Sequence, residues 1–179
     1  MSTIVTIASS PNVRSRSTAL LSYAETLLQE AGFNLQRFDL GDFPAEDLLG
    51  AHRESEAAIS FNQALAAADG VVIAGPVYKS TYNAVLKGIL DLVAKKGLAG
   101  KAVVTLTTVG NPDHRLLLER HLRPLLAIAD ARIVVEGAFA ADDELPWPDE
   151  ADQLVLGETV QARVQAAVRR LRQELESAT

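Results

Sequence analysis

Hydroxyl and guanidinium side chains gather in the polar loop that follows the first strand-like run of the chain. The run covers residues 4–8, and the loop carries Ser10, Ser15, Arg16 and Ser17. A helical pattern begins directly after the loop, so the free backbone amides of a helix N-terminus are expected beside these side chains. Amides, hydroxyls and arginines together can bind a phosphate without lysine or metal. The alternative is that Ser15 or Ser17 only caps the helix.

Two further loops offer surfaces suited to a flat ring. The second loop follows an apolar run at 71–74, and its Val77 and Tyr78 present an apolar and aromatic wall. The third follows a run at 102–106, and its backbone amides are suited to hydrogen bonding with the polar edge of a ring. The alternative is that Tyr78 and Tyr82 are ordinary residues at a helix start. The predicted ring contacts are Pro76, Val77, Tyr78 and Lys79 in the second loop and Thr108, Val109 and Gly110 in the third.

The elements that position these loops are short β-branched runs alternating with segments of helical period. Five such pairs, joined by right-handed crossovers, predict an α/β three-layer sandwich with a five-stranded parallel sheet and helices on both faces. Ligands of such sheets bind outside the carboxyl ends of the strands, where all three loops are expected. The third strand is expected to end at Gly75-Pro76. Strands are predicted at 4–8, 34–40, 71–74, 102–106 and 132–135, helices at 17–30, 56–68, 81–95, 114–128 and 155–175, and an irregular connection at 41–55.

The composition limits the possible protein classes. A length of 179 residues predicts a single domain over 1–179, and 48% hydrophobic with 22% charged residues excludes intrinsic disorder. A net charge of -6 argues against a nucleic-acid partner. The absence of cysteine excludes disulfides, a thiolate nucleophile and cysteine-ligated metals. No apolar run approaches membrane-spanning length and the N-terminus lacks signal-peptide features, so we expect no membrane association and a cytoplasmic location.

Several nucleotide and metal sites are missing as motifs. The chain has neither Gly-x-Gly-x-x-Gly nor Gly-Lys-Ser/Thr, which argues against a nicotinamide Rossmann domain and a phosphate-binding NTPase loop. A receiver domain is disfavoured because Gly75-Pro76 stands where its aspartate would be, and a low-molecular-weight phosphatase would need a cysteine. His52, His114 and His121 lack metal-binding spacing, so no metal site is expected.

Four stretches carry a resemblance to a known family, and they extend over the chain up to about Phe139. They are Ser10-Pro11 with Ser15-Arg16-Ser17, Ala68-Asp69-Gly70 leading to Pro76-Val77-Tyr78-Lys79, Leu86-Lys87 with Leu90-Asp91, and Leu98-Ala99-Gly100-Lys101. With these stretches the chain resembles the NADPH-dependent FMN reductases of flavodoxin-like fold, particularly the reductase components of two-component alkanesulfonate monooxygenases. It departs from their pattern at Ser9-Ser10, where Gly-Ser is common, and at Val109-Gly110, where Gly-Gly is common.

The resemblance implies a site for FMN. Its phosphate would lie at Ser10, Ser15, Arg16 and Ser17, and its ring between the 76–79 and 108–110 loops. NADPH, with NADH as a possible substitute, would stack on the open face of the ring. Hydride passes directly from nicotinamide to flavin, so we expect no catalytic acid, base or nucleophile from the protein. The amides of 108–110 are the candidates for stabilising charge on the reduced ring.

The resemblance also implies partners. Reduced FMN would serve a flavin-dependent monooxygenase, in sulfonate sulfur assimilation, and the protein would form a homodimer or homotetramer, as the leucine-rich stretch 116–126 also suggests. His121 is the counterpart of a residue that can create a π-bulge in sulfonate-system reductases. The alternative is that His121 is a residue of the helix surface.

Three other functions fit the same fold. A quinone or azo-dye reductase would keep FMN as a prosthetic group, and a flavodoxin-like electron carrier would have no nicotinamide site. The third is a flavin-binding interaction protein without turnover. The arginines of the first loop and the modest net charge disfavour the carrier, because flavodoxins typically have Thr/Ser-rich phosphate loops and strongly acidic surfaces.

Overall fold

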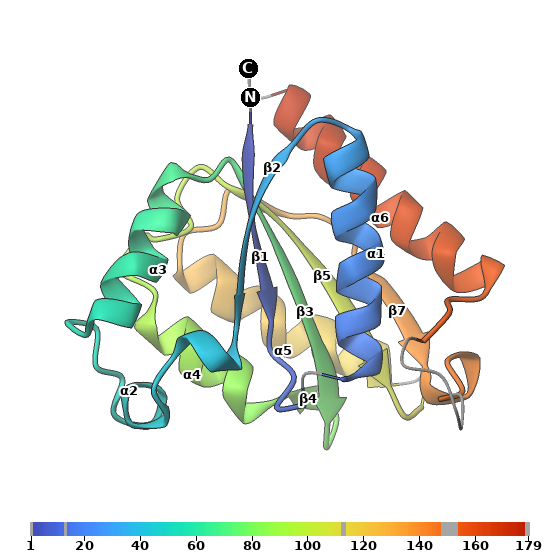
Figure 1. Ribbon diagram of the computed structural model, residues 1–179, viewed down its shortest axis with the longest axis horizontal. Helices are drawn as coiled ribbons and strands as arrows, with labels where there is room; N and C mark the ends of the chain where they lie inside the picture. Colours follow the sequence, from blue (N-terminus) through green and yellow to red (C-terminus); the bar gives the residue numbers. More distant parts are fainter. Residues whose placement is uncertain (1, 13, 112–113, 148–153, 178–179) are drawn as a thin grey trace.

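A parallel sheet forms the middle layer of the protein, and helices cover both of its faces (Figure 1). The computed structural model describes residues 2–12, 14–111, 114–147 and 154–177, with the backbone alone described for 114–119. Its strands are β1 (Thr3–Ala8), β2 (Asn34–Asp39), β3 (Gly70–Tyr78), β4 (Thr81–Tyr82), β5 (Ala102–Val109), β6 (Ile133–Val134) and β7 (Ala138–Ala141). The order is β2-β1-β3-β5-β6, with β7 also paired to β5 and β4 to β3. This order, with β6 and β7 sharing one position, confirms the predicted flavodoxin-like α/β sandwich.

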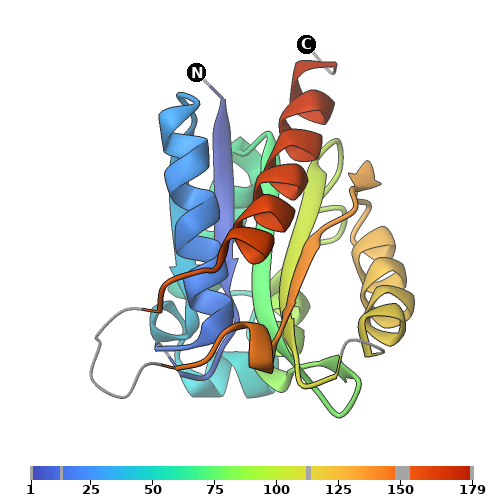
Figure 2. The same ribbon diagram turned by 90° about the vertical axis from the view of Figure 1, so that its right-hand side faces the viewer.

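Two groups of helices enclose the sheet, as Figure 2 shows from the side. Helices α1 (Arg16–Glu30) and α6 (Glu158–Glu176) pack on one face, and α3 (Glu56–Ala67), α4 (Ala84–Leu92) and α5 (His114–Ile128) on the other. A shorter helix, α2 (Ala45–Gly50), lies in the connection predicted to be irregular. None of the helices within the described residues has the length and apolar character needed to cross a bilayer.

The central strands are apolar on both faces, which explains why they read as continuous hydrophobic runs. In β3, Val72 and Ala74 face α1 and α6, whereas Val71 and Ile73 face α3 and α4, and all four side chains are buried. The alternation follows from the period of two along a strand. Helical side chains such as Leu20 of α1 pack against this apolar surface of the sheet.

The third strand does not end at Gly75-Pro76, as the sequence suggested. It continues to Tyr78, with Gly75 beside Thr107 and Pro76 beside Thr108 of β5. Because β1 has already ended at Ala8, β3 has a free edge on that side, where a proline costs few sheet hydrogen bonds.

Beyond that edge the chain turns back in a tight hairpin between β3 and β4. Lys79 and Ser80, at its tip, have φ of 50° and 63°, the left-handed conformation typical of a two-residue hairpin turn. The hairpin delays the next helix, which begins at Ala84 instead of residue 81. Asn83 caps that helix, because its side chain accepts a hydrogen bond of 2.9 Å from the Leu86 amide.

The last strand position is divided in two, and together with the hairpin strand β4 this gives the sheet seven strands where five were predicted. Both β6 and β7 run parallel to β5, and Gly137 lies between them. A side chain at Gly137 would overlap the Thr105 carbonyl oxygen, so the backbones approach there too closely for any residue but glycine.

Helix α5 is α-helical throughout, so the π-bulge considered for His121 is not formed. The assignment is continuous from His114 to Ile128, and the His121 side chain is exposed. The structure therefore favours the alternative, in which His121 is a residue of the helix surface.

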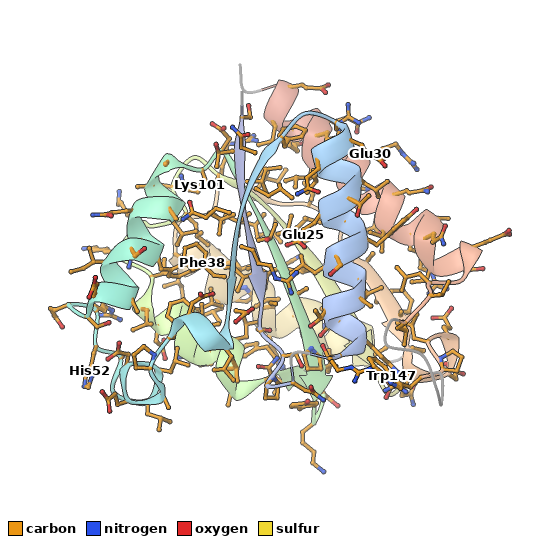
Figure 3. All side chains as sticks on the ribbon, viewed as in Figure 1. Glu25, Glu30, Phe38, His52, Lys101 and Trp147 are labelled. Carbon is orange, nitrogen blue, oxygen red and sulfur yellow. The ribbon has the colours of Figure 1, made fainter. Side chains whose placement is uncertain are left out.

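Three phenylalanines fasten the outer strand β2 to α3. Phe61 is fully buried and packs nearly perpendicular to Phe43, with ring centroids 5.4 Å apart, and edge-on to Phe38 at 5.0 Å. Such edge-to-face pairs add to the stabilisation from burial. Phe38 is labelled in Figure 3, between β2 and α3.

We expect Phe61→Ala to lower the free energy of unfolding by about 3–5 kcal/mol, because it leaves a cavity between two aromatic rings. Urea denaturation measures the loss. The control is Ile59→Ala on the same helix, where the side chain is 47% exposed, and its expected cost is below about 1 kcal/mol. Equal losses in the two variants would contradict a central role for the aromatic cluster.

Candidate functional site

A cavity of about 560 Å³ lies at the carboxyl ends of the central strands. Its volume is in the range typical of small-molecule and cofactor sites. In Figure 1 these strand ends are at the bottom of the molecule, beside the N-terminal end of α1. The cavity is lined by Ser10, Asn12, Arg14, Ser15, Arg16, Pro76, Val77, Tyr78, Thr108, Gly110, Asp142 and Trp147.

The ends of β1 and β3 form a step directly before the lining residues Ser10 and Pro76 in the chain. The Ser9 amide donates a hydrogen bond of 2.8 Å to the Ala74 carbonyl oxygen, and the Ser9 hydroxyl donates to the same oxygen at 3.0 Å. The side-chain nitrogen Nδ2 of Asn83 then donates to Ser9 Oγ and to the Pro76 carbonyl oxygen, each at 3.2 Å. A side chain at Gly75 would collide with Ser9 Oγ. These contacts hold the exit of β3 in place.

The first loop forms one end of the cavity and leads into α1. Ser15 is the N-cap residue, and its Oγ accepts a hydrogen bond of 3.1 Å from the Thr18 amide. The Asn12 amide donates to Ser10 Oγ at 3.1 Å, and the Arg14 amide donates to Asn12 Oδ1 at 3.0 Å. No acidic residue lies in the first turn of α1, so its positive end remains available to an anion. Ser15 therefore both caps the helix and lines the cavity.

Arg16 is turned toward the loop that follows β7. Its Nε donates a hydrogen bond of 2.7 Å to the Leu145 carbonyl oxygen, and one terminal nitrogen lies 3.9 Å from Asp142 Oδ1. The guanidinium still borders the cavity. Arg16 thus joins the start of α1 to the wall opposite it.

That wall is anchored from behind by α6. Arg163 donates to Glu144 Oε2 at 2.7 Å and lies 4.7 Å from the centre of the Phe139 ring, and the same Glu144 oxygen accepts from the Ala141 amide at 2.9 Å. The hydrogen bond from Arg163 is the main cause that holds the pKa of Glu144 below its ordinary value of 4.5. The loop that carries Asp142 and Trp147 is therefore held by α6 through Glu144 and by α1 through Leu145.

The other end of the cavity is apolar and aromatic. Pro76 and Val77 are half-buried, whereas Tyr78 is 50% exposed at the mouth. Thr108 and Gly110 lie at the end of the neighbouring strand β5. Among the described residues that line the cavity, the ionisable side chains are those of Arg14, Arg16, Tyr78 and Asp142.

The structure brings together most of the residues predicted from the sequence. The cavity is bordered by Ser10, Ser15, Arg16, Pro76, Val77, Tyr78, Thr108 and Gly110. Three others lie outside its lining. Ser17 and Val109 are buried, with 1% exposure each, and Lys79 is exposed at the hairpin tip.

Four lining residues were missed by the sequence analysis. Asn12 and Arg14 belong to the first loop, where residue type alone did not separate them from their neighbours. Asp142 and Trp147 follow the last strand β7. The rule that ligands bind beyond the carboxyl ends of parallel strands points to this fourth loop as well.

Residues 2–145 match the family described as NADPH-dependent FMN reductase. The chain belongs to that family. It is accordingly an FMN-reducing oxidoreductase, with FMN and a reduced nicotinamide nucleotide as its cofactors.

Similar proteins support the assignment along most of the chain. The FMN reductase (NADPH) of Pseudomonas putida strain KT2440 is 36% identical over 161 residues, which cover 90% of this chain and 82% of that protein. The FMN reductase (NADPH) of Escherichia coli K12 is 38% identical over 142 residues, 79% of this chain and 74% of that protein. The apo crystal structure of the NADH:FMN oxidoreductase EMOB has a TM-score of 0.84 at 29% identity, covering 97% of this chain and 89% of that one.

We expect Gly75→Ala in this reductase to lower the free energy of unfolding by about 1–3 kcal/mol, because the added methyl group collides with the Ser9 hydroxyl. Urea denaturation of Gly75→Ala, Ser9→Ala and the double variant tests the contact. The double variant should lose less stability than the sum of the two single losses, since removing the hydroxyl makes room for the methyl group. Additive losses would show that the two residues do not collide.

The pairing of Glu144 predicts a dependence of stability on pH. Its folded-state pKa is lowered, so the carboxylate stabilises the fold above the unfolded-state pKa, and this stabilisation is lost as the pH falls through the folded-state value. The free energy of unfolding of the wild type should exceed that of Glu144→Gln by about 1 kcal/mol near pH 7. Urea unfolding between pH 7 and pH 3 should show the two proteins converging on the acid side. A constant difference over that range would contradict the pairing.

Proposed function

We propose that this reductase binds FMN in the cavity at the strand ends, reduces it with NADPH and releases it to a flavin-dependent monooxygenase that acts in sulfonate sulfur assimilation. The observation that carries the proposal is the division of the cavity into two chemically different ends. One end holds hydroxyls and the N-terminus of α1, and the other holds an apolar and aromatic wall. FMN has the same two parts, a phosphate and a flat ring.

The phosphate end would rest on α1. The first-turn amides of α1 and the hydroxyls of Ser10 and Ser15 are the hydrogen-bond donors there. Arg16 contributes positive charge from the side, although its Nε is held by Leu145. The fit supports a phosphate bound mainly by amides and hydroxyls.

The ring end would lie between the β3 extension and the end of β5. Val77 and Tyr78 supply the apolar surface, and the backbone around Thr108 and Gly110 supplies polar groups at the opposite side. Bound FMN supplies the atom that accepts hydride. The residues of this chain orient the ring and shield one side of it from water, and the half-exposed Tyr78 marks the mouth through which a second molecule can enter.

Release of the flavin is supported by the modest charge of the site. Among the described lining residues, the positive charges are Arg14 and Arg16, and Asp142 lies 3.9 Å from one nitrogen of Arg16. A partly neutralised site suits a flavin that binds and leaves in each cycle. The NADH-dependent FMN reductase SfnE of Pseudomonas putida is 29% identical over 95% of this chain, whereas the FMN reductases (NADPH) of Pseudomonas putida KT2440 and Escherichia coli K12 are 36% and 38% identical over 90% and 79% of it. NADPH is therefore the proposed donor.

Assembly, location and domain organisation stay predictions. The exposed Ile128, at 83% exposure on the last turn of α5, agrees with a homodimer or homotetramer built through that helix. A single domain and a cytoplasmic location are likewise predictions from the sequence.

The central experiment is steady-state oxidation of NADPH and NADH by flavin-stripped protein at rising FMN concentration. The proposal predicts saturable dependence on free FMN, a higher kcat/KM for NADPH and loss of added FMN on dialysis. Flavin that survives dialysis, together with a requirement for a quinone or dye, would instead identify a reductase with prosthetic FMN.

Neighbouring hairpin residues provide a matched test of the ring end. We expect Tyr78→Ala to raise the KM for FMN about tenfold, because the aromatic surface against the ring is lost. Lys79→Asn should leave it within about twofold, because Lys79 lies outside the cavity lining and asparagine tolerates the left-handed backbone. The measurement is the FMN dependence of NADPH oxidation. An equal effect of both variants would place the ring elsewhere.

A further inference from the structure

The side chain of Asn83 is a buried polar group just outside the cavity lining. It lies between the end of β4 and the start of α4 and is 3% exposed. Its Oδ1 accepts a hydrogen bond of 2.9 Å from the Leu86 amide, and its Nδ2 donates to Ser9 Oγ and to the Pro76 carbonyl oxygen at 3.2 Å each. Capping α4 requires only the bond that Oδ1 accepts. The two donated bonds therefore need a separate explanation.

The bond to Pro76 closes the base of the hairpin between β3 and β4. Val77 pairs with Tyr82 in this hairpin, so Pro76 and Asn83 face each other one position nearer to its base. Strand β1 pairs with β3 only until it ends at Ala8, so it supplies no donor for the Pro76 carbonyl oxygen. The Asn83 side chain therefore takes the place of a neighbouring strand at this point of the edge.

The bond to Ser9 connects the same hairpin base to the first loop. Ser9 directly precedes Ser10 of the phosphate end, and Pro76 directly precedes Val77 of the ring end. A single nitrogen atom, Nδ2 of Asn83, is thus bonded to the start of both ends of the cavity. Ser9 is fully buried, so water does not compete for its bond.

We propose that Asn83 is a positioning residue that sets the distance between the phosphate end and the ring end of the cavity. The inference rests on the proposed function, because it requires FMN to occupy both ends. A ligand that binds at two places gains the full affinity only when their separation matches its own length. Without the two donated bonds, the hairpin is no longer held at a fixed distance from the first loop, and FMN loses part of that gain.

The test compares FMN with riboflavin, which has the same ring but no phosphate. The change in flavin fluorescence on binding to flavin-stripped protein gives both dissociation constants. The wild type should prefer FMN by about a hundredfold, because riboflavin lacks the charge-assisted bonds of the phosphate. In Asn83→Asp the affinity for FMN should fall about tenfold, whereas that for riboflavin should stay within about twofold, because riboflavin uses the ring end alone.

Two substitutions separate positioning from capping. Asn83→Asp still accepts from the Leu86 amide, and Asp is as good an N-cap residue as Asn. Its carboxylate cannot donate to the Pro76 carbonyl oxygen, which then faces a second acceptor. Asn83→Ser also keeps a capping side chain and adds no buried charge, but its single hydroxyl proton cannot replace both donated bonds. The same loss of preference for FMN is expected in both variants.

The matched control is Ser55→Ala. Ser55 caps α3 through a hydrogen bond of 3.2 Å from the Ala58 amide to its Oγ, and it lies outside the cavity lining. Removal of this cap should lower the stability toward urea but leave the preference for FMN over riboflavin unchanged. The control therefore shows that a loss of stability does not by itself alter the preference.

Every other outcome decides against the inference. Equal losses for FMN and riboflavin would make Asn83 a structural residue of the ring end, and unchanged affinities would remove it from flavin binding. A shift in Asn83→Asp alone would assign the effect to the buried charge. These results leave the proposed function standing, since the wild type still prefers FMN. A wild type that binds both flavins equally would instead reject the two-ended site of the proposed function, and the role of Asn83 with it.

Discussion

The site depends on the unequal length of adjacent strands in one sheet. Strand β1 ends at Ala8, while β3 continues to Tyr78 and β5 to Val109, and the Ser9 amide closes the last bond between β1 and β3. The step formed in this way leaves room above β1 for the polar loop, and it leaves the extended end of β3 as a wall. Because parallel strands all point their carboxyl ends to the same edge, each later loop also reaches this room. The first cavity is a consequence of that geometry.

The contact between Ser9 and Gly75 shows how the step is maintained. The chain carries Ser9-Ser10 directly after β1. Here the Ser9 hydroxyl occupies the space that a side chain at Gly75 would need, and it bonds both Ala74 and Asn83. Since Asn83 also caps α4, one small polar cluster connects the end of β1 and the exit of β3 to α4.

The opposite wall is built from the last third of the chain. Arg163 of α6 holds Glu144, and Arg16 of α1 holds Leu145, so the loop after β7 is fastened from two helices on the same face of the sheet. This loop brings Asp142 and Trp147 to the cavity. The arginine expected to bind phosphate therefore also has a structural task, because its Nε is committed to a backbone oxygen.

The sequence by itself determined the layers of the protein and the edge of the sheet where the site lies. Apolar runs of strand length and helical stretches of period 3.6 report local burial, and that information is sufficient to predict the alternation, the parallel sheet and the first three loops. It also identified residues such as Ser15, Val77 and Thr108, since they lie in the segments between a predicted strand and the next predicted helix. The tertiary structure decided where strands ended, because Gly75-Pro76 stops a strand only if a neighbour needs its hydrogen bonds, and β1 no longer runs beside it there. It also decided the interruption at Gly137, the orientation of Arg16 and the arrival of Asp142 and Trp147, because each depends on residues distant in the chain whose positions no local pattern contains.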